Sequence, residues 1–376
     1  MSFNVKTNFV NLFVNEPLEL EAGEKLANIQ VAFQTYGKLN SEKTNVILVF
    51  HALTGNAHAG GILSNIEKDN NSKYDFLEKY SIMNNNKLGW WDGIIGPGKA
   101  LDTEKYFIIC ANILGSCYGT TGPTSYKPNS NENWGLDFPV ITVRDMIKVH
   151  KELLNYLRIE KIKACIGGSL GGFQVLEFGI MYPDVCEILF PIACDVINSD
   201  WAIAFNEIQR NIILADKNWN NGNYNGNTIE NIGIARMVGL MSYRTPENYI
   251  QKFGRKYISE KYYSKNTRFD VSSYFNHQAN KFITRFDPIS YLTILQATDL
   301  HDISYERAPF EDVLGSIKAK TISIVIDTDL LYLPEHQKKF TNLIPDSKTF
   351  EISSPYGHDA FLIEFEQLNA ILKNYL

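Results

Sequence analysis

The chain of 376 residues is 44% hydrophobic and 21% charged, a composition typical of a soluble globular protein with enough apolar material for a large core. Its formal net charge is -6, with no block of five or more like charges. Nucleic-acid binding needs clustered lysine and arginine, so a nucleic-acid partner is not expected. No stretch approaches the roughly 18 apolar residues of a membrane span, and the first residues lack the pattern of a secretory leader. We therefore expect a cytoplasmic protein without a membrane partner.

Short runs of β-branched and aromatic residues, bounded by turn residues, predict strands in both the first half and the last sixty residues of the chain. Most of these runs are continuously apolar, as buried parallel strands are. Helical periodicity at 143–157 lies between two of them, and such alternation of strands and helices predicts an α/β fold. The predicted strands are 29–34, 46–50, 106–111, 162–166, 188–192, 321–326 and 348–352.

The alternation stops after Ala193 and resumes near Lys318, and the residues between contain helical patterns instead of strands. We predict a core domain made of residues 1–194 and 318–376, with residues 195–317 as a helical insertion. An insertion after a central strand should cover a site at the carboxyl ends of the strands, as a lid does. The helical patterns cover 203–214, 229–240 and 246–253, and an Asn- and Gly-rich turn covers 220–227.

The segment Gly167-Gly168-Ser169-Leu170-Gly171 follows one of the predicted strands directly. Small residues on both sides of a serine at a strand-to-helix turn are typical of a nucleophile elbow. Its strained backbone projects the hydroxyl above the edge of the sheet. The alternative is a glycine-rich loop whose serine only caps the following helix. The surrounding residues must decide between covalent catalysis and capping.

A serine nucleophile needs a base, and the base needs an acidic group that fixes its tautomer. His358 follows the last predicted strand, and both Asp327 and Asp329 follow the strand 321–326. Together with Ser169 they give the order Ser, Asp, His that is found in α/β hydrolases. The sequence leaves both aspartates open as the acid, with Asp329 preferred.

The segment 51–55 follows the strand 46–50, where an α/β hydrolase has the loop that donates half of its oxyanion hole. We predict that the amide of Leu53 or Thr54 and the amide of Leu170 stabilise the oxyanion. His51 is expected to be structural. Because His51 and His58 lack acidic or cysteine partners at ligand spacing, no metal site is predicted.

These segments, with others in the same order, resemble the homoserine O-acyltransferases, a family with the α/β-hydrolase fold that starts methionine biosynthesis. The resemblance spans nearly the whole chain. It implies a mostly parallel central sheet with an inserted helical lid, and transfer of an acyl group, most simply acetyl, from acyl-CoA to L-homoserine. It also implies no cofactor beyond the acyl-CoA cosubstrate, and a homodimer built through the lid helices. The similar segments are 51–55, 89–93, 96–99, 101–103, 119–123, 167–172, 216–220 and 357–361.

The resemblance also assigns roles to individual residues. It implies a triad of Ser169, Asp329 and His358. It further implies that Arg210 binds the carboxylate of the amino acid, for which a guanidinium offers a bidentate fork, and that Asp359 binds the ammonium group. From the residues alone, Arg210 would be a solvated helix residue and Asp359 would hold the turn around the histidine.

The chain departs from the family pattern in two places. Leu170 replaces the usual methionine, and the segment 330–333 lacks the usual tryptophan and first proline. Both changes leave open whether the donor is acetyl-CoA or succinyl-CoA, and the acceptor is open between homoserine, serine and another alcohol. An esterase, or a degenerate hydrolase that only binds a ligand, would also fit the serine motif. Arg210 and Asp359 argue against an esterase, which needs neither.

Overall fold

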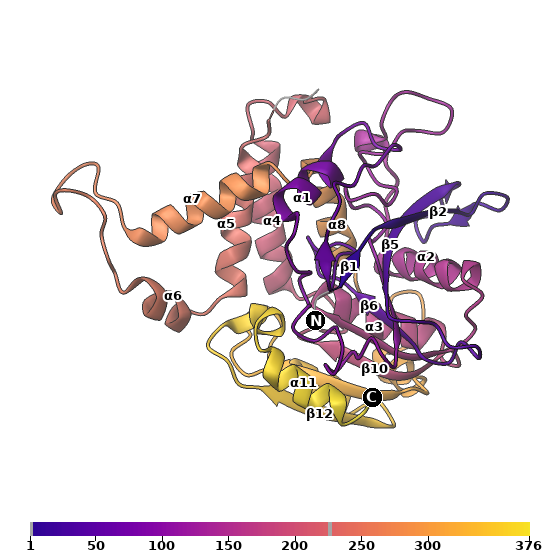
Figure 1. Ribbon diagram of the computed structural model, residues 1–376. Helices are drawn as coiled ribbons and strands as arrows, with labels where there is room; N and C mark the ends of the chain where they lie inside the picture. Colours follow the sequence, from indigo (N-terminus) through magenta and orange to yellow (C-terminus); the bar gives the residue numbers. More distant parts are fainter. Residues whose placement is uncertain (1–2, 225–227) are drawn as a thin grey trace.

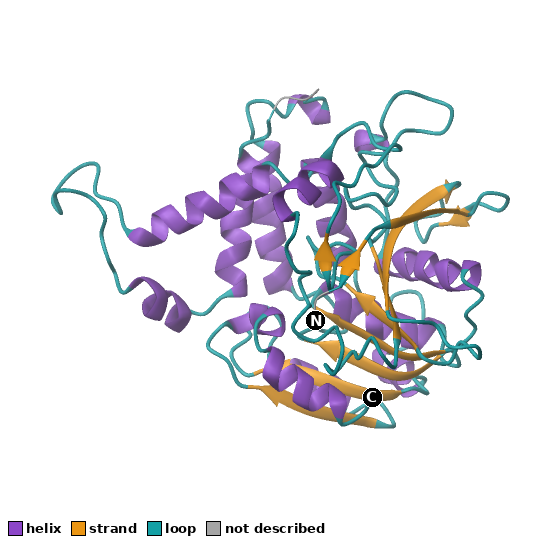
Figure 2. Ribbon diagram, in the orientation of Figure 1, coloured by secondary structure: helices purple, strands orange, loops and turns teal. Residues whose placement is uncertain are grey.

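The computed structural model describes residues 3–224 and 228–376 and has a central sheet of eight strands (Figures 1 and 2). All neighbouring pairs from the β12 edge to β8 are parallel, whereas β5 is antiparallel to both β8 and β2. The expected mostly parallel sheet is confirmed. Across the sheet the strands are β12 (Ser347–Ile352), β11 (Lys320–Ile326), β10 (Cys186–Ile192), β9 (Ile162–Gly168), β6 (Val46–Phe50), β8 (Phe107–Ala111), β5 (Ile29–Tyr36) and β2 (Asn8–Leu12).

All seven predicted strands are present, each with ends within two residues of the prediction. The eighth, β2, was not predicted, because it is a short edge strand in which Asn8 and Asn11 interrupt the apolar residues. Two small sheets lie outside the main one. They pair β1 (Asn4–Val5) with β7 (Ile62–Leu63) and β3 (Leu18–Glu19) with β4 (Lys25–Leu26).

Strand β6 shows why the central strands are continuously apolar. Leu48 and Phe50 belong to one hydrophobic core, and Ile47 and Val49 belong to the core on the other face of the sheet. Successive side chains in a strand point to opposite faces, so a strand covered on both faces must be apolar throughout. Helices α2 (Val143–Tyr156) and α3 (Leu170–Met181) cover the first face, and α11 (Phe365–Lys373) covers the second.

Helix α2 begins at a capping box, which sets its start one residue after Thr142. The Thr142 hydroxyl accepts a hydrogen bond from the Asp145 amide at 3.3 Å, and the Asp145 carboxylate accepts one from the Thr142 amide at 2.9 Å. These contacts satisfy amides that the first turn leaves without helical partners. The helix predicted at 143–157 is therefore present as Val143–Tyr156.

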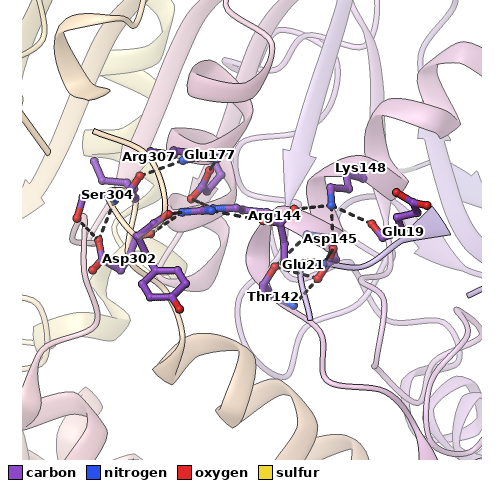
Figure 3. Close-up of polar contacts among 12 residues, drawn as sticks. Glu19, Glu21, Thr142, Arg144, Asp145, Lys148, Glu177, Asp302, Ser304 and Arg307 are labelled. Atoms are coloured by element: carbon purple, nitrogen blue, oxygen red, sulfur yellow. Dashed lines mark hydrogen bonds and ion pairs between the residues drawn. The ribbon is translucent and has the colours of Figure 1, made fainter. Parts of the chain in front are cut away.

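An ion network around the buried Glu177 joins helices α2 and α3 to residues 302–307, near the end of the predicted insertion (Figure 3). Glu177 of α3 lies 3.4 Å from Arg144 Nε of α2 and 2.7 Å from Arg307 Nη2. Arg144 also donates to the carbonyls of Asp302 and Tyr305, at 3.0 and 2.7 Å. Burial raises the pKa of Glu177, and the two guanidinium groups oppose that rise. Because a buried carboxylate is costly unless paired, the network fixes α3 against its neighbours.

Between β10 and β11 the described residues run through six α-helices, three of them near the predicted positions. Helices α6, α7 and their connecting loop extend away from the sheet (Figure 1). Every described helix is too short or too polar to cross a membrane. The division into a core and a lid domain stays a prediction, and the turn predicted at 220–227 falls partly outside the described residues. The six helices are α4 (Asp200–Leu214), α5 (Asn231–Tyr243), α6 (Pro246–Phe253), α7 (Asp270–Ile283), α8 (Pro288–Asp299) and α9 (Phe310–Gly315).

The other described helical elements outside residues 195–317 are α1 (Phe76–Asn84), α10 (Pro334–Thr341) and the 3₁₀ segments Gly135–Asp137 and Gly357–Leu362. A further 3₁₀ segment, Asn220–Gly222, lies within residues 195–317.

Candidate active site

Ser169 lies between the end of β9 and the start of α3, with φ 60° and ψ -125°. A non-glycine residue rarely adopts this backbone region, so the turn is strained, as a nucleophile elbow is. The Ser169 side chain makes no capping hydrogen bond to α3, which removes the alternative of a helix cap. A Cβ on Gly171 would lie 2.4 Å from the Phe50 carbonyl oxygen, and one on Gly167 would lie 2.6 Å from the Gly171 backbone. Strands β9 and β6 and helix α3 therefore approach so closely that positions 167 and 171 both require glycine.

The structure brings His358 and Asp329 together. The Nδ1 atom of His358 lies 2.7 Å from Asp329 Oδ2, and both side chains are buried. The other carboxylate oxygen of Asp329 accepts hydrogen bonds from the amides of Leu331 and Tyr332, at 2.8 and 3.0 Å. These contacts hold the carboxylate in place, so that it fixes the tautomer and orientation of the imidazole.

Asp327 contacts a different segment. Its carboxylate accepts hydrogen bonds from the Ser353 hydroxyl at 2.8 Å and the Ser354 amide at 3.0 Å, and the residue is exposed. It therefore ties β11 to the loop before His358. Of the two aspartates left open by the sequence, only Asp329 contacts the histidine among the described residues.

The second nitrogen of His358 is available for proton transfer. Its Nε2 atom is buried and has no hydrogen-bond partner in the described part of the chain, and the ring packs against Tyr332 and Phe361. Burial acts to lower the pKa of His358, but the charge and hydrogen bond of Asp329, together with the charge of Asp359, outweigh it and the pKa is raised above its usual value. The pair is thus arranged to stabilise an imidazolium, as a general base requires.

Ser169 and His358 line one cavity of about 330 Å³, a size suited to a small molecule. Leu53 and Thr54 line it too, and neither amide donates a hydrogen bond to another described residue. Leu170 is the first residue of α3 and lies with Leu53 and Ser169 around an adjoining space of about 30 Å³. The predicted oxyanion donors are therefore gathered around the serine.

His51 holds the loop that carries Leu53. Its Nδ1 atom lies 2.8 Å from the Ala52 carbonyl, and Nε2 accepts a hydrogen bond from the Ile113 amide at 3.1 Å. Burial lowers the pKa of His51 to about 4, which keeps the ring neutral and allows Nε2 to accept. This agrees with a structural histidine. The described residues contain no group of three or more His, Cys, Asp or Glu side chains placed to bind a metal ion.

The prediction for Arg210 needs correction. Arg210 lies on α4, where its guanidinium pairs with Glu207 and, at 2.5 Å, with Asp299. It does not line the cavity that contains Ser169. Its partners, Glu207 of α4 and Asp299 of α8, also lie outside the lining of this cavity, so Arg210 is not positioned to bind a substrate carboxylate there.

Arg236 of α5 lines the cavity instead. Its guanidinium lies 5.5 Å from the ring centre of Tyr243 and 5.3 Å from that of Phe282, and no carboxylate of the described residues lies within 4 Å. The sequence contained a signal for this residue that went unused. Arg236 is the only charged residue in the helix Asn231–Tyr243, and a lone charge in an apolar helix is seldom there for packing.

Asp359 lines the same cavity, as predicted, and its Oδ2 atom lies 2.9 Å from Arg244 Nε. Arg244 directly follows α5 and was not singled out from the sequence. The cavity therefore presents the Asp359 carboxylate, the Arg236 guanidinium and two further cations, Lys281 and Arg285, in addition to the serine and histidine. An amino acid, which carries one charge of each sign, matches the pair Asp359 and Arg236.

Comparison with known proteins gives the family. A family model described as the α/β hydrolase fold matches residues 45–365. The homoserine O-acetyltransferase of Moorella thermoacetica is 43% identical over 366 residues, which cover 96% of this chain and 93% of that protein. The homoserine O-acetyltransferase of Carboxydothermus hydrogenoformans is 41% identical over 368 residues, which cover 96% of this chain and 92% of that one.

Two solved structures are similar over 99% of this chain. A crystal structure of homoserine O-acetyltransferase from Bacillus anthracis has a TM-score of 0.87 and 25% identity, with 98% of its chain covered. The esterase E22 has a TM-score of 0.85 and 28% identity, with 99% covered. The fold therefore serves both transferases and esterases, and it is the sequence similarity above 40% that separates them. On that similarity, the chain belongs to the homoserine O-acetyltransferase family within the α/β-hydrolase fold.

Proposed function

We propose that this chain is an acetyl-CoA:L-homoserine O-acetyltransferase that acts through a covalent acetyl-Ser169 intermediate. The observation that carries the proposal is the strained Ser169 in one cavity with the Asp329-paired His358, in a chain 43% identical to a homoserine O-acetyltransferase. The family name also supports a place in methionine biosynthesis.

In the first half-reaction, His358 Nε2 takes the proton from the Ser169 hydroxyl as the oxygen attacks the thioester carbonyl of acetyl-CoA. The amides of Leu53 or Thr54 and of Leu170 donate to the oxyanion of the tetrahedral intermediate, where one such donor typically contributes roughly 3 to 4 kcal/mol. The carbon–sulfur bond then breaks, His358 returns the proton to the thiolate, and coenzyme A leaves an acetyl ester on Ser169.

In the second half-reaction, L-homoserine enters the same cavity. Arg236 binds its carboxylate and Asp359 its ammonium group, so that the side-chain hydroxyl points toward the acetyl ester. His358 takes the hydroxyl proton, the new ester bond forms as the bond to Ser169 breaks, and the serine oxygen regains the proton. Arg236 thus takes the role that the sequence resemblance gave to Arg210.

The charged pair Arg236 and Asp359 supports a transferase over an esterase, because water as acceptor needs neither group. It supports an α-amino acid as acceptor without separating homoserine from serine. Acetyl-CoA is preferred over succinyl-CoA because the relatives above 40% identity carry the acetyl name.

The test is coenzyme A release by the purified protein with acetyl-CoA or succinyl-CoA, with and without L-homoserine or L-serine, with products identified by mass. Homoserine-dependent release with acetyl-CoA and a product about 42 Da heavier, the mass of an added acetyl group, is the expected result. Release without an acceptor and without O-acyl product would make the protein a hydrolase.

A stopped-flow burst of coenzyme A without acceptor tests the covalent step. Ser169→Ala should abolish the burst, whereas Ser41→Ala, at an exposed serine far along the chain, should leave it unchanged. A burst that survives in Ser169→Ala would contradict the acetyl-serine intermediate.

We also propose a homodimer and a cytoplasmic location. Apolar side chains exposed on the helical insertion, among them Trp201, Ile208 and Ile250, support an interface there. All five cysteines are free and buried, as is usual for a protein of a reducing compartment.

A further inference from the structure

The proposed acetyl transfer leaves part of the charge in the cavity unexplained. Three cationic side chains, Arg236, Lys281 and Arg285, line the cavity against one carboxylate, Asp359. A bound homoserine uses one positive and one negative group. Lys281 and Arg285 then remain, and neither has a carboxylate within 4 Å among residues 3–224 and 228–376.

These two cations lie on one side of the cavity wall. Gln278, Lys281, Phe282 and Arg285 all line it, and their spacing of three and four residues follows one face of α7 and its continuation. Another part of the wall includes Tyr80 and Asn84 of α1, which have the same helical spacing. The Thr284 hydroxyl contacts Met83 Sδ at 3.8 Å, so the end of α7 lies against the end of α1.

Lys281 is exposed and Arg285 is half-buried, which orders them from the mouth of the cavity inward. Arg285 is held in place: Nη1 donates to the Thr54 carbonyl at 3.3 Å and to the Tyr118 hydroxyl at 2.9 Å. The Lys281 ammonium makes no hydrogen bond or ion pair with another described residue. Burial lowers the pKa of the Lys281 ammonium, and the positive charges of Arg285, Lys87 and Arg236 lower it further. An anion at this place would relieve that repulsion.

We infer that Lys281, supported by Arg285, forms the phosphate-binding end of the acyl-donor site. The donor carries a thioester at one end and three phosphate groups at the other, so its thioester reaches Ser169 while its phosphates stay near the mouth. The inference rests on the proposed function, in which that donor is acetyl-CoA. An acetyl group, unlike a succinyl group, carries no carboxylate that Lys281 could bind. Any effect of Lys281 on the binding of acetyl-CoA therefore has to come from the phosphates.

The experiment compares acetyl-CoA with S-acetyl-N-acetylcysteamine, which has the same thioester and no phosphate, in wild type and Lys281→Gln. One charge-assisted contact predicts that kcat/KM for acetyl-CoA falls about tenfold in the variant. The values of kcat/KM for the phosphate-free donor and for homoserine should stay within about twofold. Added salt should shrink the difference between wild type and variant, because screening weakens the contact. Lys339→Gln, at an exposed lysine of α10, is the matched control and should change none of these values.

An equal fall with both donors, or a fall in kcat/KM for homoserine alone, would overturn the inference. Calorimetric titration with coenzyme A and with pantetheine tests the phosphate site separately from the proposed function, because the binding of coenzyme A needs no acceptor. Lys281→Gln should weaken coenzyme A about tenfold and leave pantetheine unchanged. If the wild type binds coenzyme A in this way but transfers no acetyl group to homoserine, the proposed function fails and the phosphate site stands. If the variant binds coenzyme A as the wild type does, the phosphate site fails.

Discussion

At the scale of single residues, the two aspartates that follow β11 give a matched pair. Asp329 contacts His358 Nδ1 at 2.7 Å, and Asp327 contacts Ser353 and Ser354. Asp329→Asn keeps the size of the side chain but stabilises the wrong imidazole tautomer, so we expect kcat to fall about 10³- to 10⁴-fold. Asp327→Asn should stay within a few-fold of wild type. Initial rates of coenzyme A release measure both, and similar losses in the two variants would contradict the assignment of Asp329.

The two arginines give a second pair. Arg236→Met removes the guanidinium that lines the cavity, and we expect KM for homoserine to rise at least about tenfold, the cost of one charge-assisted contact. Hydrolysis of p-nitrophenyl acetate, an ester without an amino-acid end, should be nearly unchanged. Arg210→Met should leave KM for homoserine within about twofold, because its contacts go to Glu207 and Asp299. The reverse pattern would restore Arg210 as the substrate residue.

Arg210 also shows what the sequence does not carry at this scale. Arg210 and Arg236 both lie on helices of the predicted insertion. Judged by residue type alone, either could bind a substrate carboxylate. Which of them faces the cavity depends on how α4 and α5 turn against each other, and that is set by packing between residues distant in sequence. Ser169, Asp329 and His358 were easier to predict, because each lies within about six residues after the end of a recognisable strand.

At the scale of elements, the close approach of α3 to β6 should be sensitive to one methyl group. A Cβ on Gly171 would lie 2.4 Å from the Phe50 carbonyl oxygen, which is backbone and has no room to move. Gly171→Ala should therefore displace α3 from the oxyanion loop, lower kcat at least about tenfold and destabilise the fold by roughly 1 to 3 kcal/mol. Enzyme assays and thermal unfolding measure the two effects.

Gly315→Ala is the control for that substitution. Gly315 is the last residue of α9, and a Cβ there would meet nothing within 4 Å. We expect unchanged activity and a stability equal to or up to about 1 kcal/mol above wild type, because alanine lowers the entropy of the unfolded chain. Activity lost in both variants, or in neither, would mean that the contact with Phe50 is not what matters.

The central strands, α2 and α8 show how the burial of an element shapes its pattern in the sequence. The central strands are covered on both faces and appear in the sequence as largely apolar runs, of which β6 is apolar throughout. Helix α2 has one apolar face and was found at its observed position. Helix α8 is buried on nearly all sides, so it lacks the periodic pattern that marks a surface helix, and it was missed. The sequence pattern therefore reveals a helix that is buried on one face and a strand that is buried on both. It does not reveal a helix that is buried on nearly all sides.

At the scale of the whole molecule, the cavity is assembled from every part of the chain. The oxyanion loop comes from the first sixty residues, Ser169 from the middle, Arg236 and Lys281 from the insertion and His358 from the end. Residues outside 195–317 supply the reacting groups, and residues 195–317, the predicted insertion, supply most of the groups proposed to bind charged substrates. Substrate choice is therefore able to change through the insertion without changes in the triad. The similarity in fold to both a homoserine O-acetyltransferase and an esterase is consistent with this separation.

The arm formed by α6, α7 and the loop between them leads to the last prediction. It extends from the body of the molecule (Figure 1), and its Ile250 is 69% exposed. Tyr249 packs on Phe253 and Phe275, with ring centres 5.9 and 5.8 Å apart, which stiffens the arm but leaves its outer side apolar. A projecting arm with an apolar outer side is typical of a contact with a second copy.

We expect wild-type protein to elute as a dimer in size-exclusion chromatography with light scattering, and Ile250→Asp to elute as a monomer. A twofold axis repeats the substitution, so two apolar contacts are lost. At about 1.5 to 3 kcal/mol each, their loss raises the dissociation constant roughly a hundredfold or more. Val14→Asp is the control, because Val14 is 60% exposed but lies on a turn far from the arm in sequence. A monomeric wild type would rule out the dimer. A dimer that survives Ile250→Asp would place the interface on the exposed face of α4, where Ile208 is also half exposed. Loss of the dimer in Val14→Asp alone would place the interface near Val14, at the opposite end of the chain.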